Sequence, residues 1–316
     1  MVQMLRAPKL EEGTRLRFLN GLVYQNLQEN KDPQPLLEIF RKVRTMPQED
    51  TQILELCTRF MVTTRQPAED VKPVLREMLA INPENSMARN LLLEYAVEAN
   101  DTAEVIRIAK PAVDYSTDDP VFYYYLGVAY FQMDSAQLAV KTFKKGLQHV
   151  DEKANLQMVT NMYALMGDAY HQLGDSKHAY ECYDSCLLYR PDEAMVLNNY
   201  AYYLSLENAH LDRAEEMSRR SLEKEGDSPT YLDTYAWILF KQKKYAEAKV
   251  YIDKALNALG DNLEANDATI VEHAGDIYSK NGLKDKALEF WQQAADLDTP
   301  SPVLLKKLNK KKYINE

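Results

Sequence analysis

Large and small side chains recur along the chain in a repeating pattern. In the clearest copy, Tyr123, Leu126 and Tyr130 are spaced three and four residues apart, and Gly127 and Ala139 are small. Large residues at this spacing form one apolar face of a helix, and that face must be covered by another helix. Two helices approach closely where small residues face each other, so we expect Gly127 to face Ala139. The pattern predicts a helical hairpin.

Five copies of this hairpin pattern can be read between residues 120 and 301. In four of them, two small residues stand twelve positions apart and are expected to face each other: Gly127 and Ala139, Gly167 and Ala179, Ala236 and Ala248, Gly275 and Ala287. Turn-forming residues separate the two predicted helices at Gly174-Asp175-Ser176, Glu207-Asn208-Ala209 and Asn281-Gly282. The tyrosines at the large positions, together with Trp291, are expected in the core between helices. No strand-period segment of any length is found.

The register continues toward the N-terminus at lower fidelity. Counting back from Pro120 in steps of 34 predicts helix starts at Ser86 and Gln52, and Val71, Leu75 and Met78 keep the apolar face of a second helix. Residues 18–46 contain two helical stretches split by Lys31-Asp32-Pro33, which predicts one more, degenerate hairpin. The total is about eight hairpins.

Two insertions and one terminal helix complete the prediction. Extra residues at 151–159 and 260–267 are expected to lengthen helices. After Pro302, the stretch VLLKKLNKKKY predicts a solitary amphipathic helix with two Leu facing inward and five Lys outward, which would cap the array. We therefore divide the chain into an N-terminal arm (1–14), degenerate hairpins (15–119), a well-formed array (120–301), and a capping helix with a basic tail (302–316).

The pattern resembles the tetratricopeptide repeat over about residues 52–301. That resemblance implies an all-α, right-handed superhelical solenoid of antiparallel helix hairpins in which each hairpin contacts its neighbours. The stretches LNNYAYYLS, SPTYLDTYAWILFKQKKYAEA and EHAGDIYSKNGLKDKALEFWQQA look like the bacterial form of the repeat. They are similar to repeat regions of Gram-negative envelope lipoproteins, although the lipid-attachment cysteine of such proteins is not present.

Composition and charge narrow the classes of partner. Acidic residues outnumber basic ones 48 to 38, giving a net charge of −10, which argues against nucleic acid as a partner. The opening MVQMLRAPKLEEGTRLRF lacks the apolar run of a signal peptide, and no segment is predicted to span a bilayer. We expect a periplasmic or outer-membrane-associated protein if a signal segment was removed, and a cytoplasmic one otherwise.

Motifs for catalysis, cofactors and metals are not found. The sequence has no phosphate-binding loop, no dinucleotide fingerprint and no HExxH. His178, Cys182 and Cys186 share one helix face, but packing explains Cys186 better than metal binding does. We expect no cofactor, no metal and no enzymatic activity. An α-helical enzyme stays open as an alternative that would need a deep pocket with strongly shifted pKa values.

The resemblance implies that first helices line a concave groove. The expected partner-binding residues there are Tyr124, Phe131, Asp168, His171, Asn198, Tyr202, Asp233, Trp237, Phe240, Glu272 and Asp276. The other groove positions of the motif are Val121, Val128, Gln132, Asn161, Ala164, Gln172, Met195, Ser205, Leu206, Thr230, Lys241, Thr269, Ser279 and Lys280. Tyr124, Tyr202, Trp237 and Phe240 are large aromatics that the hairpin itself does not require, so we interpret them as exposed anchors for a peptide. Two alternatives remain: the aromatics pack against the next hairpin, and the carboxylates form a solvated face.

These observations predict a scaffold that binds a protein or peptide in the groove. The acidic, amide-rich lining favours a neutral or basic partner segment over an acidic one. The similarity to envelope lipoproteins suggests a bacterial envelope assembly adaptor, and a cytoplasmic adaptor or co-chaperone is the alternative. Partner identity and oligomeric state are left open.

Overall fold

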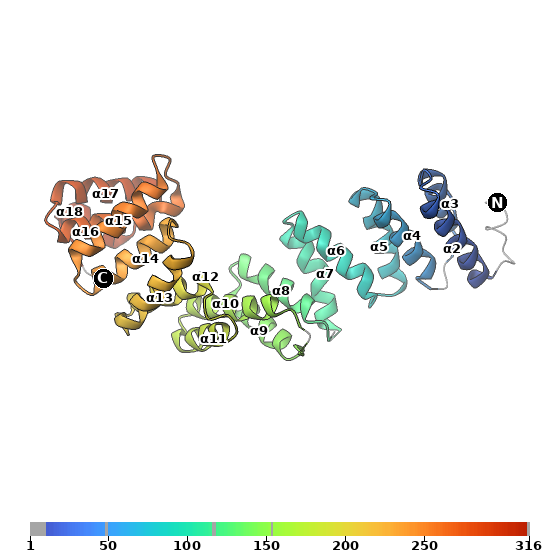
Figure 1. Cartoon of the computed structure of the whole chain (residues 1–316), viewed down its shortest axis with the longest axis horizontal. Coiled ribbons are helices and arrows are strands. Elements are labelled where there is room, and N and C mark those ends of the chain that lie inside the picture. Colours follow the sequence, from blue (N-terminus) through green and yellow to red (C-terminus); the bar gives the residue numbers. More distant parts are fainter. Residues whose placement is uncertain (1–10, 48–49, 116–117, 153, 315–316) are drawn as a thin grey trace. The chain divides into compact units, whose positions relative to one another are not determined.

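The computed structural model describes residues 11–47, 50–115, 118–152 and 154–314, and throughout these ranges the chain is helical with short connections (Figure 1). No strand occurs in them. They hold eight consecutive helical hairpins followed by a single final helix, so the predicted all-α hairpin array is confirmed. The chain divides into two compact units, residues 1–154 and 155–316, which are described separately below.

The N-terminal unit contains four hairpins. Its helices are α2 (Glu12–Gln28), α3 (Gln34–Arg44), α4 (Gln52–Thr63), α5 (Ala68–Ile81), α6 (Ser86–Glu98), α7 (Thr102–Asp114), α8 (Pro120–Gln132) and α9 (Ala136–Leu147). Helices α4, α6 and α8 begin at the predicted residues, and the split between α2 and α3 falls where Pro33 predicts it. Of the predicted N-terminal arm, residues 1–10 lie outside the described residues and residues 12–14 belong to α2.

The C-terminal unit contains four hairpins and the final helix. Its helices are α10 (Leu156–Gln172), α11 (Ser176–Tyr189), α12 (Ala194–Leu206), α13 (Leu211–Lys224), α14 (Pro229–Lys241), α15 (Tyr245–Leu259), α16 (Ala268–Lys280), α17 (Lys284–Leu297) and α18 (Pro302–Lys310), with a short 3₁₀ turn, η1, at Ala265–Asp267. The first insertion lengthens α10 to 17 residues, against 13 in α12. The second does not lengthen a helix as predicted, because Gly260 ends α15 with a φ of 75° and the chain continues as a loop.

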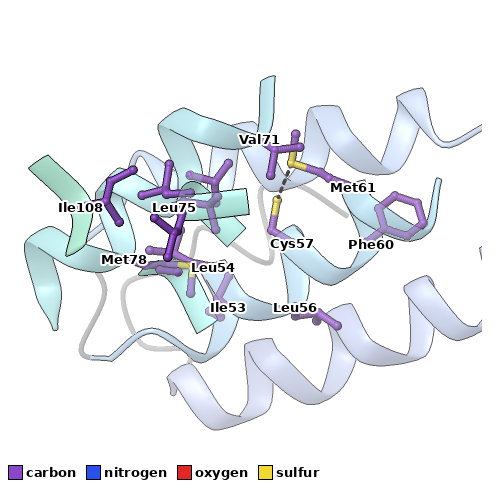
Figure 2. Close-up of a cluster of buried hydrophobic side chains, with 14 of the residues drawn as sticks. Ile53, Leu54, Leu56, Cys57, Phe60, Met61, Val71, Leu75, Met78 and Ile108 are labelled. Atoms are coloured by element: carbon purple, nitrogen blue, oxygen red, sulfur yellow. Dashed lines mark hydrogen bonds between the residues drawn. The ribbon is translucent and has the colours of Figure 1, made fainter. Parts of the chain in front are cut away.

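Buried apolar side chains fill the space between successive helices of the N-terminal unit. Figure 2 shows Leu75 and Met78 of α5 near Leu54 of α4, and Val71 of α5 beside Met61 and Cys57 of α4, and all of these residues are buried. This confirms the helix face predicted for α5.

All three cysteines of the chain are buried thiols. Cys57 lies in the core of Figure 2, with its Sγ 3.8 Å from Sδ of Met61, and burial raises its pKa to about 12. Cys182 and Cys186 lie in α11 of the C-terminal unit. Within the described part of the chain, no group of three or more His, Cys, Asp or Glu side chains is placed to hold a metal ion.

The helices of a hairpin approach closely at the predicted glycines, but the facing side chain differs from the prediction. A Cβ atom added to Gly127 would lie 2.4 Å from the ring of Phe143, and one on Gly167 would lie 2.4 Å from the ring of Tyr183. At Gly275, the ring of Trp291 would be 2.3 Å away. Each glycine therefore makes room for an aromatic ring sixteen residues later, and not chiefly for the alanine twelve residues later. Trp291 is buried in the hairpin core, as predicted.

The capping helix also departs from its prediction at one residue. Leu304 is buried as expected, but Lys307 is 3% exposed and faces inward with it. The spacing of Leu304, Lys307 and Leu308 places all three on one helix face, so the sequence carried this signal. None of the described helices is both long and apolar enough to cross a bilayer.

Candidate functional site: a cavity on the first helices of the C-terminal unit

A cavity of about 220 Å³ opens on the first helices of the C-terminal unit. Its walls come from α12, α14, α16 and α18 and from residues after α18. Four of the expected partner-binding residues line it, Tyr202, Trp237, Glu272 and Asp276, together with three other groove positions of the motif, Leu206, Lys241 and Thr269. The motif positions thus bring side chains from three hairpins to one place. We call this space the C-terminal cavity.

Stacked rings form one side of the C-terminal cavity. The indole of Trp237 stacks on the imidazole of His273 with ring centres 3.8 Å apart, and Phe240 stacks on Trp237 at 4.8 Å. Nδ1 of His273 lies 3.0 Å from both carboxylate oxygens of Asp233, and a carboxylate only accepts, so Nδ1 donates. These contacts tie α14 to α16. Within the described residues, the buried indole N–H of Trp237 has no acceptor.

A second side of the cavity is a buried ion cluster. Nζ of Lys307 in α18 lies 2.7 Å from carboxylate oxygens of both Glu272 and Asp276 in α16. Asp276 is 2% exposed and also accepts a 2.9 Å hydrogen bond from Nε1 of Trp291. Burial raises the pKa of Asp276 to about 6, although the nearby Lys307 ammonium acts to lower it. The cluster fastens α18 to the last hairpin.

The residues that follow α18 lie beside these two groups. Lys311 ends the helix in the left-handed region with a φ of 52°, and Tyr313 and Ile314 line the cavity. The ring of Tyr313 meets that of Phe240 edge-on at 5.4 Å, and Nζ of Lys280 lies 4.4 Å from the Tyr313 ring centre. The chain's own C-terminal segment therefore covers part of the predicted groove.

The predicted residues Asp168, His171 and Asn198 form a separate group at α10 and α12. Asp168 accepts hydrogen bonds from the Tyr183 hydroxyl at 2.5 Å and from the Asn199 amide at 3.3 Å. Burial raises the pKa of Asp168. It lowers the pKa of His171, which stacks on Tyr203 at 3.5 Å. Asn198 is buried, and no partner is found for its Oδ1 among the described side chains and backbone.

Tyr124 and Phe131 belong to α8 of the N-terminal unit and are half-buried there. The ring of Tyr124 meets that of the adjacent Tyr125 edge-on at 5.0 Å.

The expected exposure of the groove side chains is wrong for several of them. Trp237 and Phe240 are 7% and 4% exposed, because Trp237 stacks on the neighbouring first helix and Tyr313 covers Phe240. Asp233 and Asp276 are buried in hydrogen bonds instead of forming a solvated face. Sequence reasoning also missed the contributions of His273, Lys307, Tyr313 and Ile314 to the cavity.

Comparison with known proteins finds the tetratricopeptide repeat in part of the chain. A model of the tetratricopeptide repeat matches residues 160–193, which contain most of α10 and all of α11. The TPR repeat-containing protein PA4667 of Pseudomonas aeruginosa is 26% identical over 129 residues, which is 41% of this chain and 21% of that protein. The chain therefore contains a tetratricopeptide repeat. It spans about a fifth of the length of that curated relative.

Solved structures show the same tetratricopeptide fold. A chain of the APC/C heterotetramer Cut9–Hcn1 has a TM-score of 0.57 at 17% identity, covering 98% of this chain and 55% of the solved chain. PilF of Pseudomonas aeruginosa has a TM-score of 0.55 at 17% identity, covering 71% and 97%. A tetratricopeptide repeat protein from Parabacteroides merdae has a TM-score of 0.55 at 15% identity, covering 82% and 97%. At these identities the likeness concerns the fold alone.

Proposed function

We propose that the chain is a non-catalytic scaffold that binds a segment of a protein partner at the C-terminal cavity. One observation carries this proposal: seven predicted groove positions from three hairpins line one cavity, whose Trp237 carries a buried indole N–H without an acceptor among the described residues. A peptide carbonyl is the acceptor that such a donor fits. Tetratricopeptide repeat proteins bind proteins or peptides, which agrees with this assignment.

The charges around the cavity favour a neutral partner segment. Asp233 already faces His273, and Glu272 and Asp276 already face Lys307. Buried carboxylates with such partners contribute little attraction for a second cation. We therefore narrow the sequence-based preference for a neutral or basic segment to a neutral one.

The titratable groups of the cavity support binding better than catalysis. The pKa of Asp276 is raised, but its carboxylate holds Trp291 and Lys307 in place, and His273 is engaged by Asp233. These groups join helices together. A role in bacterial envelope assembly stays a prediction from the sequence, and the gene sequence upstream of this chain, with or without a lipoprotein signal, decides it.

The test uses surface substitutions because Trp237 and Phe240 are too buried to replace safely. Leu206 lines the cavity and is 39% exposed, whereas Leu188 in the second helix α11 is 79% exposed and does not line it. Partners captured from the native organism by the wild-type chain are identified by mass spectrometry and titrated against each variant. We expect Leu206→Glu to weaken capture at least tenfold and Leu188→Glu to leave it unchanged. Equal capture by both folded variants would overturn the proposal.

A further inference from the structure

The C-terminal segment touches the inner side of the last two hairpins at two places that are held differently. Helix α18 is fixed by buried Leu304 and by Lys307, which pairs with two carboxylates of α16. Residues 311–314 contact the array through the Tyr313 ring against Phe240 and two lysines over that ring, and backbone hydrogen bonds of 3.3 Å join Lys311 and Lys312 to α18. These residues, and not the apolar face of α18, cover part of the groove.

The fit of residues 311–314 is incomplete. Tyr313 and Ile314 are half-buried and line the cavity of about 220 Å³ together with Trp237, whose buried indole N–H has no acceptor among the described residues. A segment that fills the space and supplies a carbonyl oxygen would gain apolar burial and one buried hydrogen bond. The chain's own tail is thus an imperfect occupant of the site.

The surroundings of Tyr313 define what a better occupant must carry. Its ring lies edge-on to Phe240, with the ammonium groups of Lys280 and Lys307 at 4.4 and 5.8 Å from its centre. An aromatic ring satisfies both contacts at once, since its edge packs on another ring and its face attracts cations. An aliphatic or charged side chain would satisfy one of them at most.

We propose that the C-terminal cavity recognises an aromatic side chain of a neutral partner segment, and that this side chain replaces Tyr313 by displacing residues 311–314. This inference rests on the proposed function and adds which side chain of the partner the cavity recognises. Helix α18 stays in place during the exchange because buried Leu304 and the ion pairs of Lys307 with Glu272 and Asp276 hold it without the Tyr313 ring. The tail acts as a built-in competitor for the site.

The experiment supplies the aromatic side chain in trans to the full-length chain. The probe is the terminally blocked peptide NAAAYI, which is residues 309–314 with the three lysines replaced by alanine so that it is neutral, and its matched control NAAAAI carries alanine in place of tyrosine. Binding is measured by calorimetry to wild type, to Tyr313→Ala, and to Leu305→Ala, an exposed position of α18 that does not line the cavity. We expect Tyr313→Ala to bind the tyrosine peptide at least tenfold more tightly than wild type or Leu305→Ala, and the alanine peptide not at all.

A second readout follows the uncovering of the site. The chain has two tryptophans, so Trp291→Phe leaves Trp237 as the sole indole fluorophore. In that background we expect Tyr313→Ala to increase acrylamide quenching of Trp237 at least twofold, with unchanged helicity.

Two results would overturn the inference: equal peptide affinity of wild type and a folded Tyr313→Ala chain, or no binding by either. Peptide binding without any captured partner would leave the pocket assignment intact and contradict the proposed function, so the two failures are distinguishable.

Discussion

The hairpins α10–α11 and α16–α17 pack their two helices together in the same way, but the aspartate at that contact has different further partners in each. Each has glycine followed by aspartate in its first helix and, in its second helix, an aromatic ring that fills the space above the glycine. Asp168 accepts from the hydroxyl of Tyr183, and Asp276 accepts from the indole of Trp291. Beyond that, Asp168 meets an amide, whereas Asp276 meets the ammonium of Lys307. The shared carboxylate is an acceptor for the hairpin core, and the added lysine fastens α18 over one hairpin.

The other hairpins support this interpretation. In α8–α9 the ring over Gly127 is Phe143, which has no polar hydrogen, and Val128 stands where the aspartate would be. In α12–α13 and α14–α15 alanine replaces the glycine, and the residues sixteen positions later are aliphatic and buried, Met217 and Ile252. The small residue, its neighbour and the later core residue vary together.

The largest expected effect comes from breaking the contact that only α16–α17 has. Lys307→Met leaves two carboxylates beside a buried site without their cation, which should lower the free energy of unfolding of the C-terminal unit by about 3 kcal/mol at pH 8. Chemical denaturation followed by circular dichroism measures it. Lys306→Met, at an exposed neighbour, is the control and should change stability by less than about 0.5 kcal/mol. Similar losses in both variants would contradict the special role of Lys307.

Asp276 and Asp168 should contribute to the pH dependence of the unfolding free energy to different extents. The pKa of Asp276 in the folded chain, about 6, is above that of an unfolded aspartate. Its favourable contribution is therefore complete at low pH and is lost as pH rises through about 6, by at most about 3 kcal/mol between pH 4 and pH 8. The difference in unfolding free energy between wild type and Asp276→Asn should show this slope. Asp168→Asn should show the same sign with a smaller slope, and a slope of opposite sign for Asp276 would refute the burial argument.

Adding a methyl group at the glycine tests the close helix–helix contact that the hairpins have in common. Gly127→Ala should cost about 2 kcal/mol because its Cβ would overlap the ring of Phe143. Adding Phe143→Ile, the combination found in α14–α15, should recover about 1 kcal/mol of coupling in a double-mutant cycle. Gly21→Ala is the control, since nothing lies within 4 Å of a Cβ there, and it should stabilise α2 by up to about 1 kcal/mol. If the stability changes of the two substitutions simply add, the small residue and the core residue sixteen positions later are not coupled.

The smallest expected effect concerns the hydrogen bond between Tyr183 and Asp168. Tyr183→Phe should cost about 1 kcal/mol because Asp168 loses its closest donor. Conversely, Phe143→Tyr should be destabilising alone and less so together with Val128→Asp, which supplies the acceptor found in α10–α11. Thermal unfolding of Tyr183→Phe, Phe143→Tyr, Val128→Asp and the Phe143→Tyr/Val128→Asp double variant measures both effects. If Phe143→Tyr lowers stability equally with Val or Asp at position 128, the aspartate does not act as the acceptor for the tyrosine hydroxyl.

The hairpin array was predictable because its signals are local. Helix starts at Gln52, Ser86 and Pro120 follow from the repeat length, and the loops at Gly174 and Gly282 follow from turn chemistry, with φ values of 74° and 81°. The helix face of each groove residue also follows from its motif position, which is why seven predicted positions meet at one cavity. The residues that pack against that helix face could not be predicted from the sequence pattern. The Lys307–Asp276 and Tyr313–Phe240 contacts join segments far apart in sequence, and no periodic pattern encodes them.

Each unit carries at least one buried thiol: Cys57 in the N-terminal unit, and Cys182 and Cys186 in the C-terminal unit. The rate at which each thiol reacts therefore measures how often its own unit opens. A thiol-specific alkylating reagent reaches these sulfur atoms when the surrounding helices open. Peptide mapping of the alkylated sites over time would thus report opening rates for the two halves from one unmodified sample.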